Sequence, residues 1–91
     1  MSITVQLPNV LSRLAGGARQ LDGEGTTLSE VIGEICGRFP QLAPRLRDAN
    51  GEPYPFVTIY LNDEDIRFQG GFGAPVKSGD VVTVVPAVAG G

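Results

Sequence analysis

Apolar residues occupy every second position at the start of the chain: Ile3, Val5 and Leu7. This period is typical of a half-buried strand. Pro8 ends the strand, because proline has no N–H to donate to a ladder. Residues 9–14 are expected to form a loop or a short helical turn. The glycine pair at 16–17 then predicts a hairpin turn into a second strand, at about residues 18–21.

The strongest helical pattern begins at a capping box formed by Thr27 and Glu30. In this motif the Thr27 hydroxyl accepts from the Glu30 N–H, and the Glu30 carboxylate accepts from the Thr27 N–H. Apolar residues then recur on one helical face: Leu28, Val31, Ile32, Ile35, Cys36 and Phe39. Gly37 is expected to stop the helix, with Pro40 just beyond it. A single amphipathic helix of this length must pack on a sheet, because nothing else in the chain can cover its apolar stripe.

The second half of the chain contains a strong strand pattern at residues 56–61. Val57, Ile59 and Leu61 fall on one face of this strand, and Phe56, Thr58 and Tyr60 fall on the other. Before it, residues 42–46 favour a short helical turn, and residues 48–53 have the composition of a loop.

Two further strands are predicted after residue 61. A turn at 62–65 leads to a short strand at 66–68, and the turn at 77–80 precedes the last strand, at 81–85. The resulting order of two strands, a main helix and three strands is that of an α+β protein with the β-grasp (ubiquitin-like) fold. We therefore expect a mixed sheet of four to five strands on one main helix. The domain would span residues 1–85, with a flexible tail at 86–91.

Composition narrows the function. The net charge is −3 and Lys77 is the only lysine, which disfavours nucleic acid as a partner. No apolar run is long enough for a membrane span, and the start lacks the features of a signal peptide, so we expect a cytoplasmic protein. The chain has no histidine and one cysteine, which argues against Ser-His-Asp or Cys-His catalysis and against a metal site. We therefore expect a substrate or partner of enzymes, with no bound cofactor, rather than an enzyme.

Three features with possible chemistry have simpler interpretations. Cys36 falls at helical spacing among apolar residues and is expected to be a buried core residue. The acidic run 63–65 lacks a calcium-loop pattern and is expected to be a solvated turn. The glycines at 70–73 lack the lysine and helix start of a phosphate-binding loop.

The chain ends in Pro86-Ala87-Val88-Ala89-Gly90-Gly91. Glycine has no Cβ, so Gly90 and Gly91 can enter a narrow channel as backbone alone. We interpret Gly91 as the reactive carboxylate, and the five residues before it as the segment threaded into a partner. The alternative is an idle, frayed terminus.

One face of the predicted sheet has a candidate docking surface: Phe56, Thr58, Tyr60, Thr83 and Val85. A contiguous patch of this kind near the tail would bind the proteins that act on the tail. The alternative is a scatter of surface apolar residues, which is common.

The chain resembles the MoaD/ThiS-type ubiquitin-like sulfur carriers. The resemblance covers essentially the whole chain and is carried by the capped helix, the turn at Gly79-Asp80 and the Gly-Gly ending. The segment Tyr60–Phe68 and the tail are most similar to the branch of this family that serves cysteine biosynthesis in actinobacteria.

This resemblance implies a cycle run by other proteins. An E1-like enzyme of the MoeB/ThiF type would use ATP to adenylate Gly91, and a sulfur source would convert the adenylate to a thiocarboxylate. The sulfur would pass to a synthase, either a PLP-dependent cysteine synthase or a thiazole-synthase-like enzyme, and a JAMM-type metalloprotease is a possible later partner. Two alternatives stay open: a ubiquitin-like modifier conjugated through Gly91 to lysines, and a β-grasp subunit with an idle tail.

Overall fold

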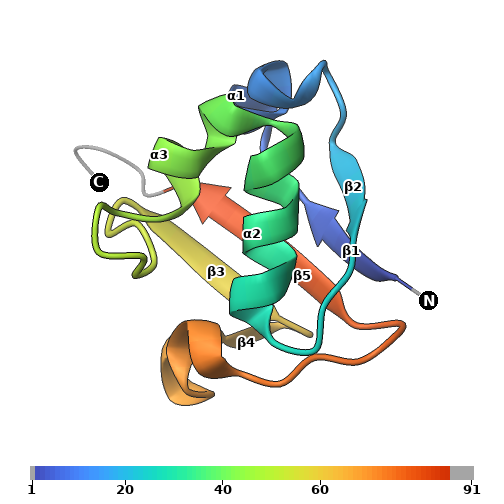
Figure 1. Ribbon diagram of the computed structural model, residues 1–91, viewed down its shortest axis with the longest axis vertical. Coiled ribbons are helices and arrows are strands. Elements are labelled where there is room, and N and C mark those ends of the chain that lie inside the picture. Colours follow the sequence, from blue (N-terminus) through green and yellow to red (C-terminus); the bar gives the residue numbers. More distant parts are fainter. Residues whose placement is uncertain (1, 87–91) are drawn as a thin grey trace.

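The computed structural model describes residues 2–86 of the chain. These residues form a five-stranded sheet with helices on one side (Figure 1). The strands are β1 (Ile3–Gln6), β2 (Gln20–Gly23), β3 (Val57–Leu61), β4 (Glu64–Asp65) and β5 (Val81–Pro86). The helices are α1 (Asn9–Ser12), α2 (Leu28–Arg38) and α3 (Ala43–Leu46). Within the described residues, no helix is long and apolar enough to cross a membrane.

The strand order is β2-β1-β5-β3-β4, so the last strand of the chain lies in the middle of the sheet. β5 runs parallel to β1, with Val5 opposite Val82, and antiparallel to β3, with Ile59 opposite Val84. Both β1–β2 and β3–β4 are antiparallel hairpins. This mixed sheet with α2 packed across it is the β-grasp fold that the sequence predicts.

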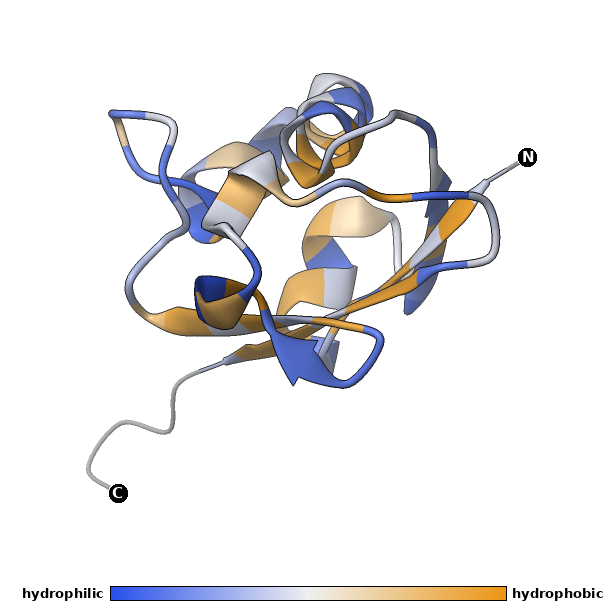
Figure 2. Ribbon diagram, turned by 90° about the horizontal axis from the view of Figure 1, so that it is seen from below, coloured by the Kyte–Doolittle hydropathy of each residue, from blue (hydrophilic) through white to orange (hydrophobic). Residues whose placement is uncertain are grey.

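The core fills the space between α2 and the sheet. The four residues of α2 that are fully shielded from solvent are Leu28, Val31, Ile32 and Ile35. Alternate residues of the central strands face them, as the predicted strand patterns require, because successive side chains of a strand point to opposite faces. In Figure 2 the central strands are largely hydrophobic (orange), whereas the short β4 is hydrophilic (blue).

Two glycines allow α2 to approach β2 closely. A Cβ on Gly23 would lie 2.9 Å from Val31 Cγ1, and a Cβ on Gly25 would lie 2.6 Å from Glu30 Cβ. Both distances are shorter than real carbon contacts, so the helix can occupy this position only with glycine beneath it.

The ends of α2 differ in detail from the prediction. The Thr27 hydroxyl accepts from the Glu30 N–H, as expected. The Glu30 carboxylate bonds the N–H and hydroxyl of Thr26, at 2.6 and 2.9 Å, rather than the Thr27 N–H. At the other end, Gly37 does not stop the helix: α2 continues to Arg38. The Phe39 backbone, at φ −129° and ψ 81°, leaves the helical region just before Pro40, since the residue before a proline disfavours helical geometry.

Two strand positions were predicted incorrectly. β2 begins at Gln20 rather than near Ala18, because α1 and a 3₁₀ turn at Arg13–Ala15 take up more of the connection. The short strand after β3 is Glu64–Asp65, and Ile66–Phe68 is a 3₁₀ turn.

The cause of the second error lies in the β3–β4 turn. Asn62 and Asp63 both have left-handed backbones, at φ 52° and 70°, which closes a hairpin with only two loop residues. Pairing therefore resumes at Glu64, opposite Leu61. It ends at Asp65, whose carboxylate accepts from the Arg67 N–H and caps the 3₁₀ turn.

Candidate functional site

The base of the C-terminal tail is held in the sheet. β5 extends to Pro86, which lies opposite Val57 of β3, so the predicted boundary between residues 85 and 86 falls inside the strand. Proline cannot donate a backbone hydrogen bond, which suits the last position of a ladder. The predicted reactive and threading residues after it (Ala87, Val88, Ala89, Gly90 and Gly91) lie outside the described residues.

Four of the five predicted docking residues are brought together by the strand register. Thr58 lies opposite Val85, and Tyr60 lies opposite Thr83. The Thr83 hydroxyl also reaches across to β1, where it donates to Gln6 Oε1 at 3.2 Å. Because the core side chains of β3 and β5 are the residues between these, the docking residues occupy the sheet face opposite α2.

Phe56, the fifth predicted docking residue, lies one residue before β3. Its side chain is 64% exposed, and Val85 on the neighbouring strand is 40% exposed. The ring of Phe56 meets the ring of Tyr54 edge to face, with centroids 5.4 Å apart. We call Tyr54, Phe56, Thr58 and Val85 the tail-base patch. Tyr54 is not among the predicted docking residues, although two aromatics in a short proline-rich loop are a usable signal for an exposed recognition element.

A hydrogen-bonded junction fixes where β5 begins. The buried carboxylate of Asp80 accepts from Asn62 Nδ2 at 3.0 Å and from the Lys77 N–H at 2.9 Å. Asn62 Oδ1 in turn accepts from the Val81 N–H at 3.0 Å. These bonds hold the pKa of Asp80 below its usual range, and the bond from Asn62 has a larger effect than the bond from Lys77. The junction thus ties the β3–β4 turn to the first residue of the strand that leads to the tail.

The other candidate reactive groups have structural roles. Cys36 is 4% exposed in the core, and burial raises the pKa of its thiol, so the prediction of a buried core residue is confirmed. Asp63 and Glu64 are exposed in the β3–β4 hairpin, and Asp65 is paired with Arg67 at 2.7 Å. Among residues 2–86, no group of three carboxylate, thiol or imidazole side chains is arranged to hold a metal ion.

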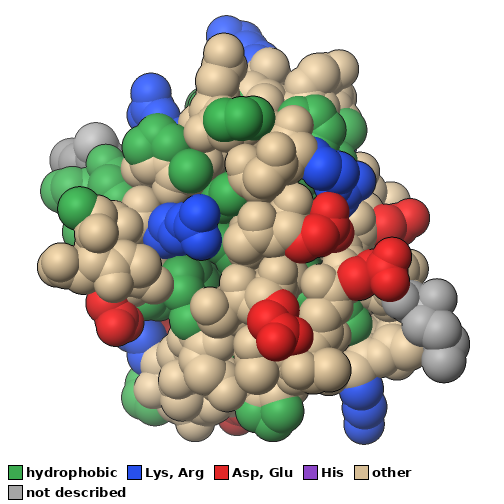
Figure 3. All heavy atoms as spheres, in the orientation of Figure 1, with side chains coloured by type: hydrophobic (Ala, Val, Ile, Leu, Met, Phe, Trp, Pro, Cys, Tyr) green, Lys and Arg blue, Asp and Glu red, His purple; other side chains and the backbone are tan. Residues whose placement is uncertain are grey.

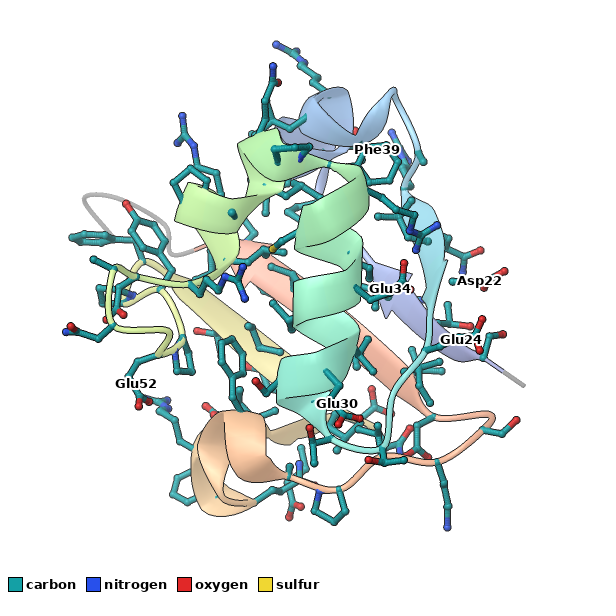
Figure 4. All side chains as sticks on the ribbon, in the orientation of Figure 1. Asp22, Glu24, Glu30, Glu34, Phe39 and Glu52 are labelled. Carbon is teal, nitrogen blue, oxygen red and sulfur yellow. The ribbon has the colours of Figure 1, made fainter. Side chains whose placement is uncertain are left out.

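Charge is unevenly distributed over the surface. On the face viewed in Figure 3, carboxylates gather over α2 and β2, and Figure 4 identifies Asp22, Glu24, Glu30 and Glu34 there. The tail-base patch lies instead where β3 begins and β5 ends, on the sheet face away from α2. A partner that binds at the tail base therefore meets an apolar surface rather than the acidic one.

Comparison with known proteins gives one family. The model of the ThiS family matches residues 5–91. CysO of Mycobacterium tuberculosis, a sulfur carrier protein, is 41% identical over 93 residues, covering 100% of both chains. A putative sulfur carrier protein of Archaeoglobus fulgidus is 32% identical over 91 residues, again with full coverage of both.

Comparison with a solved structure indicates the same family. The chain superposes on a chain from the Amycolatopsis orientalis BexX/CysO complex with a TM-score of 0.90 at 39% identity, covering 98% of this chain and 99% of the other. The resemblance predicted from the sequence is confirmed. The chain belongs to the ThiS family of ubiquitin-like sulfur carriers.

Proposed function

We propose that this carrier is loaded with sulfur at the carboxylate of Gly91 and delivers it to a biosynthetic enzyme. The observation that carries the proposal is the placement of β5. The central strand of the sheet ends at Pro86, beside the tail-base patch, so a partner docked on the patch lies next to the chain that leads to Gly91. The names of the relatives, which are sulfur carriers, support the same role.

The activation step needs ATP from a partner. A Gly91 carboxylate oxygen attacks the α-phosphorus of ATP, pyrophosphate leaves, and an acyl adenylate forms. A sulfide-equivalent nucleophile then attacks the carbonyl carbon and AMP leaves, which gives a thiocarboxylate. A carboxylate is a poor electrophile until its oxygen becomes a good leaving group, so a partner must hold the tail and ATP in line. An E1-like enzyme of the MoeB/ThiF type fits this step, and its need for ATP fits a cytoplasmic cycle.

The tail residues have complementary roles in this proposal. Pro86 ends the ladder, Ala87, Val88 and Ala89 present small side chains to the wall of a channel, and Gly90 and Gly91 enter as backbone. The chain itself acts as the substrate of other enzymes and not as a catalyst.

The acceptor of the sulfur is a second partner. A PLP-dependent cysteine synthase is the acceptor that fits the CysO relatives best, with a thiazole-synthase-like enzyme as the alternative and a JAMM-type protease as a later partner. The Amycolatopsis orientalis complex of CysO with BexX supports a protein partner for this chain. We propose that the activating enzyme and the acceptor bind the surface of Phe56, Thr58, Tyr60, Thr83 and Val85 in turn.

Intact-mass analysis of the protein recovered from its native host tests the proposal. We expect a species heavier by the exchange of one oxygen for sulfur, and its loss when Gly91 is deleted. Gly37→Ala is the matched control, because this glycine is exposed and a Cβ there meets nothing within 4 Å. Adducts carrying a Gly-Gly remnant on the lysines of other proteins, without the sulfur species, would indicate a protein modifier instead. The absence of both species would refute activation at Gly91.

A further inference from the structure

A groove runs along β3 on the side away from β5. β4 is only two residues long and pairs with Tyr60 and Leu61, so residues 57–59 have no strand beside them on that edge. A hollow of about 300 Å³ occupies this position. Its floor is Val57, Thr58 and Ile59, and its walls are residues 53–55 on one side and residues 65–67 on the other. We call it the β3-edge groove.

The ladder determines which backbone groups face the groove. The Asn62 N–H donates to the Val81 carbonyl at 2.8 Å, so the backbone groups of Tyr60 and Thr58 also point to β5, and those of Ile59 and Val57 point to the groove. The Val57 N–H is taken by the Tyr54 carbonyl at 3.2 Å. The described residues provide no hydrogen-bond partner for the Val57 carbonyl or the Ile59 N–H.

The opposite edge of the sheet also has a backbone carbonyl followed two residues later by an N–H, and there both groups are hydrogen-bonded. On β2 the Asp22 carbonyl accepts from Arg38 Nη2, and the Glu24 N–H donates to Glu34 Oε1 at 3.2 Å. Glu34 and Arg38 are themselves joined at 2.7 Å. Two side chains of α2 therefore occupy the place of a further strand beside β2. Free strand edges are normally blocked in this way, because they pair with other chains. Among residues 2–86, no side chain hydrogen-bonds to residues 57–59 of the β3 edge in this way.

We propose that the β3-edge groove binds an extended segment of a partner protein, which adds to the sheet parallel to β3. One residue of the segment lies opposite Thr58, donates its N–H to the Val57 carbonyl and accepts from the Ile59 N–H. A carbonyl followed two residues later by an N–H is the pattern that a single residue of a parallel strand satisfies.

The walls fit a backbone ligand better than a small apolar molecule. Arg67 is fixed by Asp65, with Nε and Nη2 within 3.1 and 2.7 Å of Oδ2, yet its side chain is 75% exposed. Because the side chain is largely exposed, the remaining N–H groups of its guanidinium are available for a carbonyl or carboxylate oxygen of the segment.

The position of the groove connects it to the tail. Val57 lines the groove and also lies opposite Pro86, the last described residue of β5. A segment added beside β3 lies two strand spacings from β5, about 10 Å. A partner held there is anchored beside the base of the tail, at an edge that adjoins the tail-base patch, because Tyr54 and Thr58 belong to both.

Selection of linear heptapeptides displayed on phage, followed by NMR of the ¹⁵N-labelled protein, tests the proposal without any sulfur chemistry. We expect selected peptides to shift the amides of residues 57–59 and 65–67, and to protect the Ile59 amide from hydrogen exchange. Methylation of single peptide nitrogens should abolish binding at the residue opposite Thr58 and be tolerated at its two neighbours. If methylation weakens binding equally at neighbouring peptide nitrogens, strand addition is refuted.

Two charge reversals provide a matched comparison. Arg67→Glu should weaken peptide binding about fivefold, the effect of an exposed ion pair of about 1 kcal/mol. Arg13→Glu, an exposed arginine on the 3₁₀ turn after α1, should leave it unchanged. Peptides that shift the Val85 amide but leave the amides of Ile59 and residues 65–67 unchanged, or no binding at millimolar concentration, would overturn the proposal. Because the peptides need no activated tail, neither result bears on the loading of Gly91.

Discussion

At the scale of single residues, Asp80 links three parts of the chain through one carboxylate. We predict that Asp80→Asn lowers the free energy of unfolding by about 1 to 3 kcal/mol, because an amide nitrogen cannot accept the bond from Asn62 and the charge that strengthens both bonds is lost. Urea unfolding at pH 7 measures the change. Asp63→Asn, on an exposed residue of the same hairpin, is the control and should have little effect.

The effect of Asp80→Asn on stability should depend on pH, and the sign of this dependence follows from the pKa of Asp80. The pKa of Asp80 is lower in the folded protein than in the unfolded chain, chiefly because of the bond from Asn62. Its contribution is therefore fully present above the ordinary carboxyl pKa of about 3.9, and is lost as the pH falls through the folded value. The difference between the wild type and Asp80→Asn should shrink on acidification from pH 7 to pH 3. A difference that is equal at both pH values would contradict this assignment.

Two glycines of the α2–β2 region should respond in opposite directions to alanine. At Gly23 a Cβ would lie 2.9 Å from Val31 Cγ1 and 3.2 Å from Ile35 Cδ1, both fully buried, so Gly23→Ala should cost about 1 to 3 kcal/mol of stability. Gly37 is exposed inside α2 with open space around it, so Gly37→Ala should stabilise the protein by up to about 1 kcal/mol. Thermal unfolding measures both changes. Steric crowding should lower the unfolding temperature of Gly23→Ala, and helix propensity should raise that of Gly37→Ala.

At the scale of elements, the cover over β2 can be removed with one substitution. Glu34→Ala takes away the acceptor of the Glu24 N–H. We expect exchange of the Glu24 amide with deuterium to accelerate about fivefold, which corresponds to one hydrogen bond of about 1 kcal/mol. Ser29→Ala, at an exposed position of the same helix, should leave that amide unchanged. An unchanged rate in Glu34→Ala would mean that Glu34 does not shield the edge in solution.

Elements with a strong periodic pattern were predicted well from the sequence. α2 and β3 each bury a full face, so their apolar spacing carries the prediction: Ile32 and Ile59, for example, are both in the core. β4 was misplaced because its position depends on two left-handed residues, Asn62 and Asp63, and not on a hydrophobic pattern. The end of α2 was misplaced for a similar reason, since Gly37 has no left-handed backbone and simply continues the helix.

The positions of the docking residues could be predicted from the sequence only where they follow from the alternation of side chains along a strand. The pairs Thr58–Val85 and Tyr60–Thr83 lie on one face because both strands alternate and their register is fixed by the core. Tyr54 was missed because its contact with Phe56 is made by a loop. The β3-edge groove was also missed, because it exists only where β4 stops early, and the length of β4 was not evident from the sequence.

At the scale of the whole molecule, the tail-base patch should control encounters with the activating enzyme. Phe56 is 64% exposed, and for Phe56→Ala we expect kcat/KM for ATP-dependent loading to fall about 5- to 30-fold, the effect of about 1 to 2 kcal/mol at a central aromatic contact. Val10→Ala, a 62% exposed residue on α1, is the control and should be loaded normally. Equal loading of both variants would place the docking surface elsewhere.

The central position of β5 has a consequence for synthesis of the protein. β1 and β3 each pair with β5, so neither half of the sheet is joined to the other until residues 81–86 are available. These residues leave the ribosome last among the described elements, and contacts so distant along the chain form late. An unfinished chain therefore exposes its core to proteases, whereas a folded one has already incorporated the strand that leads to Gly91. The strand that joins the two halves of the sheet is thus also the strand that leads to the proposed site of loading.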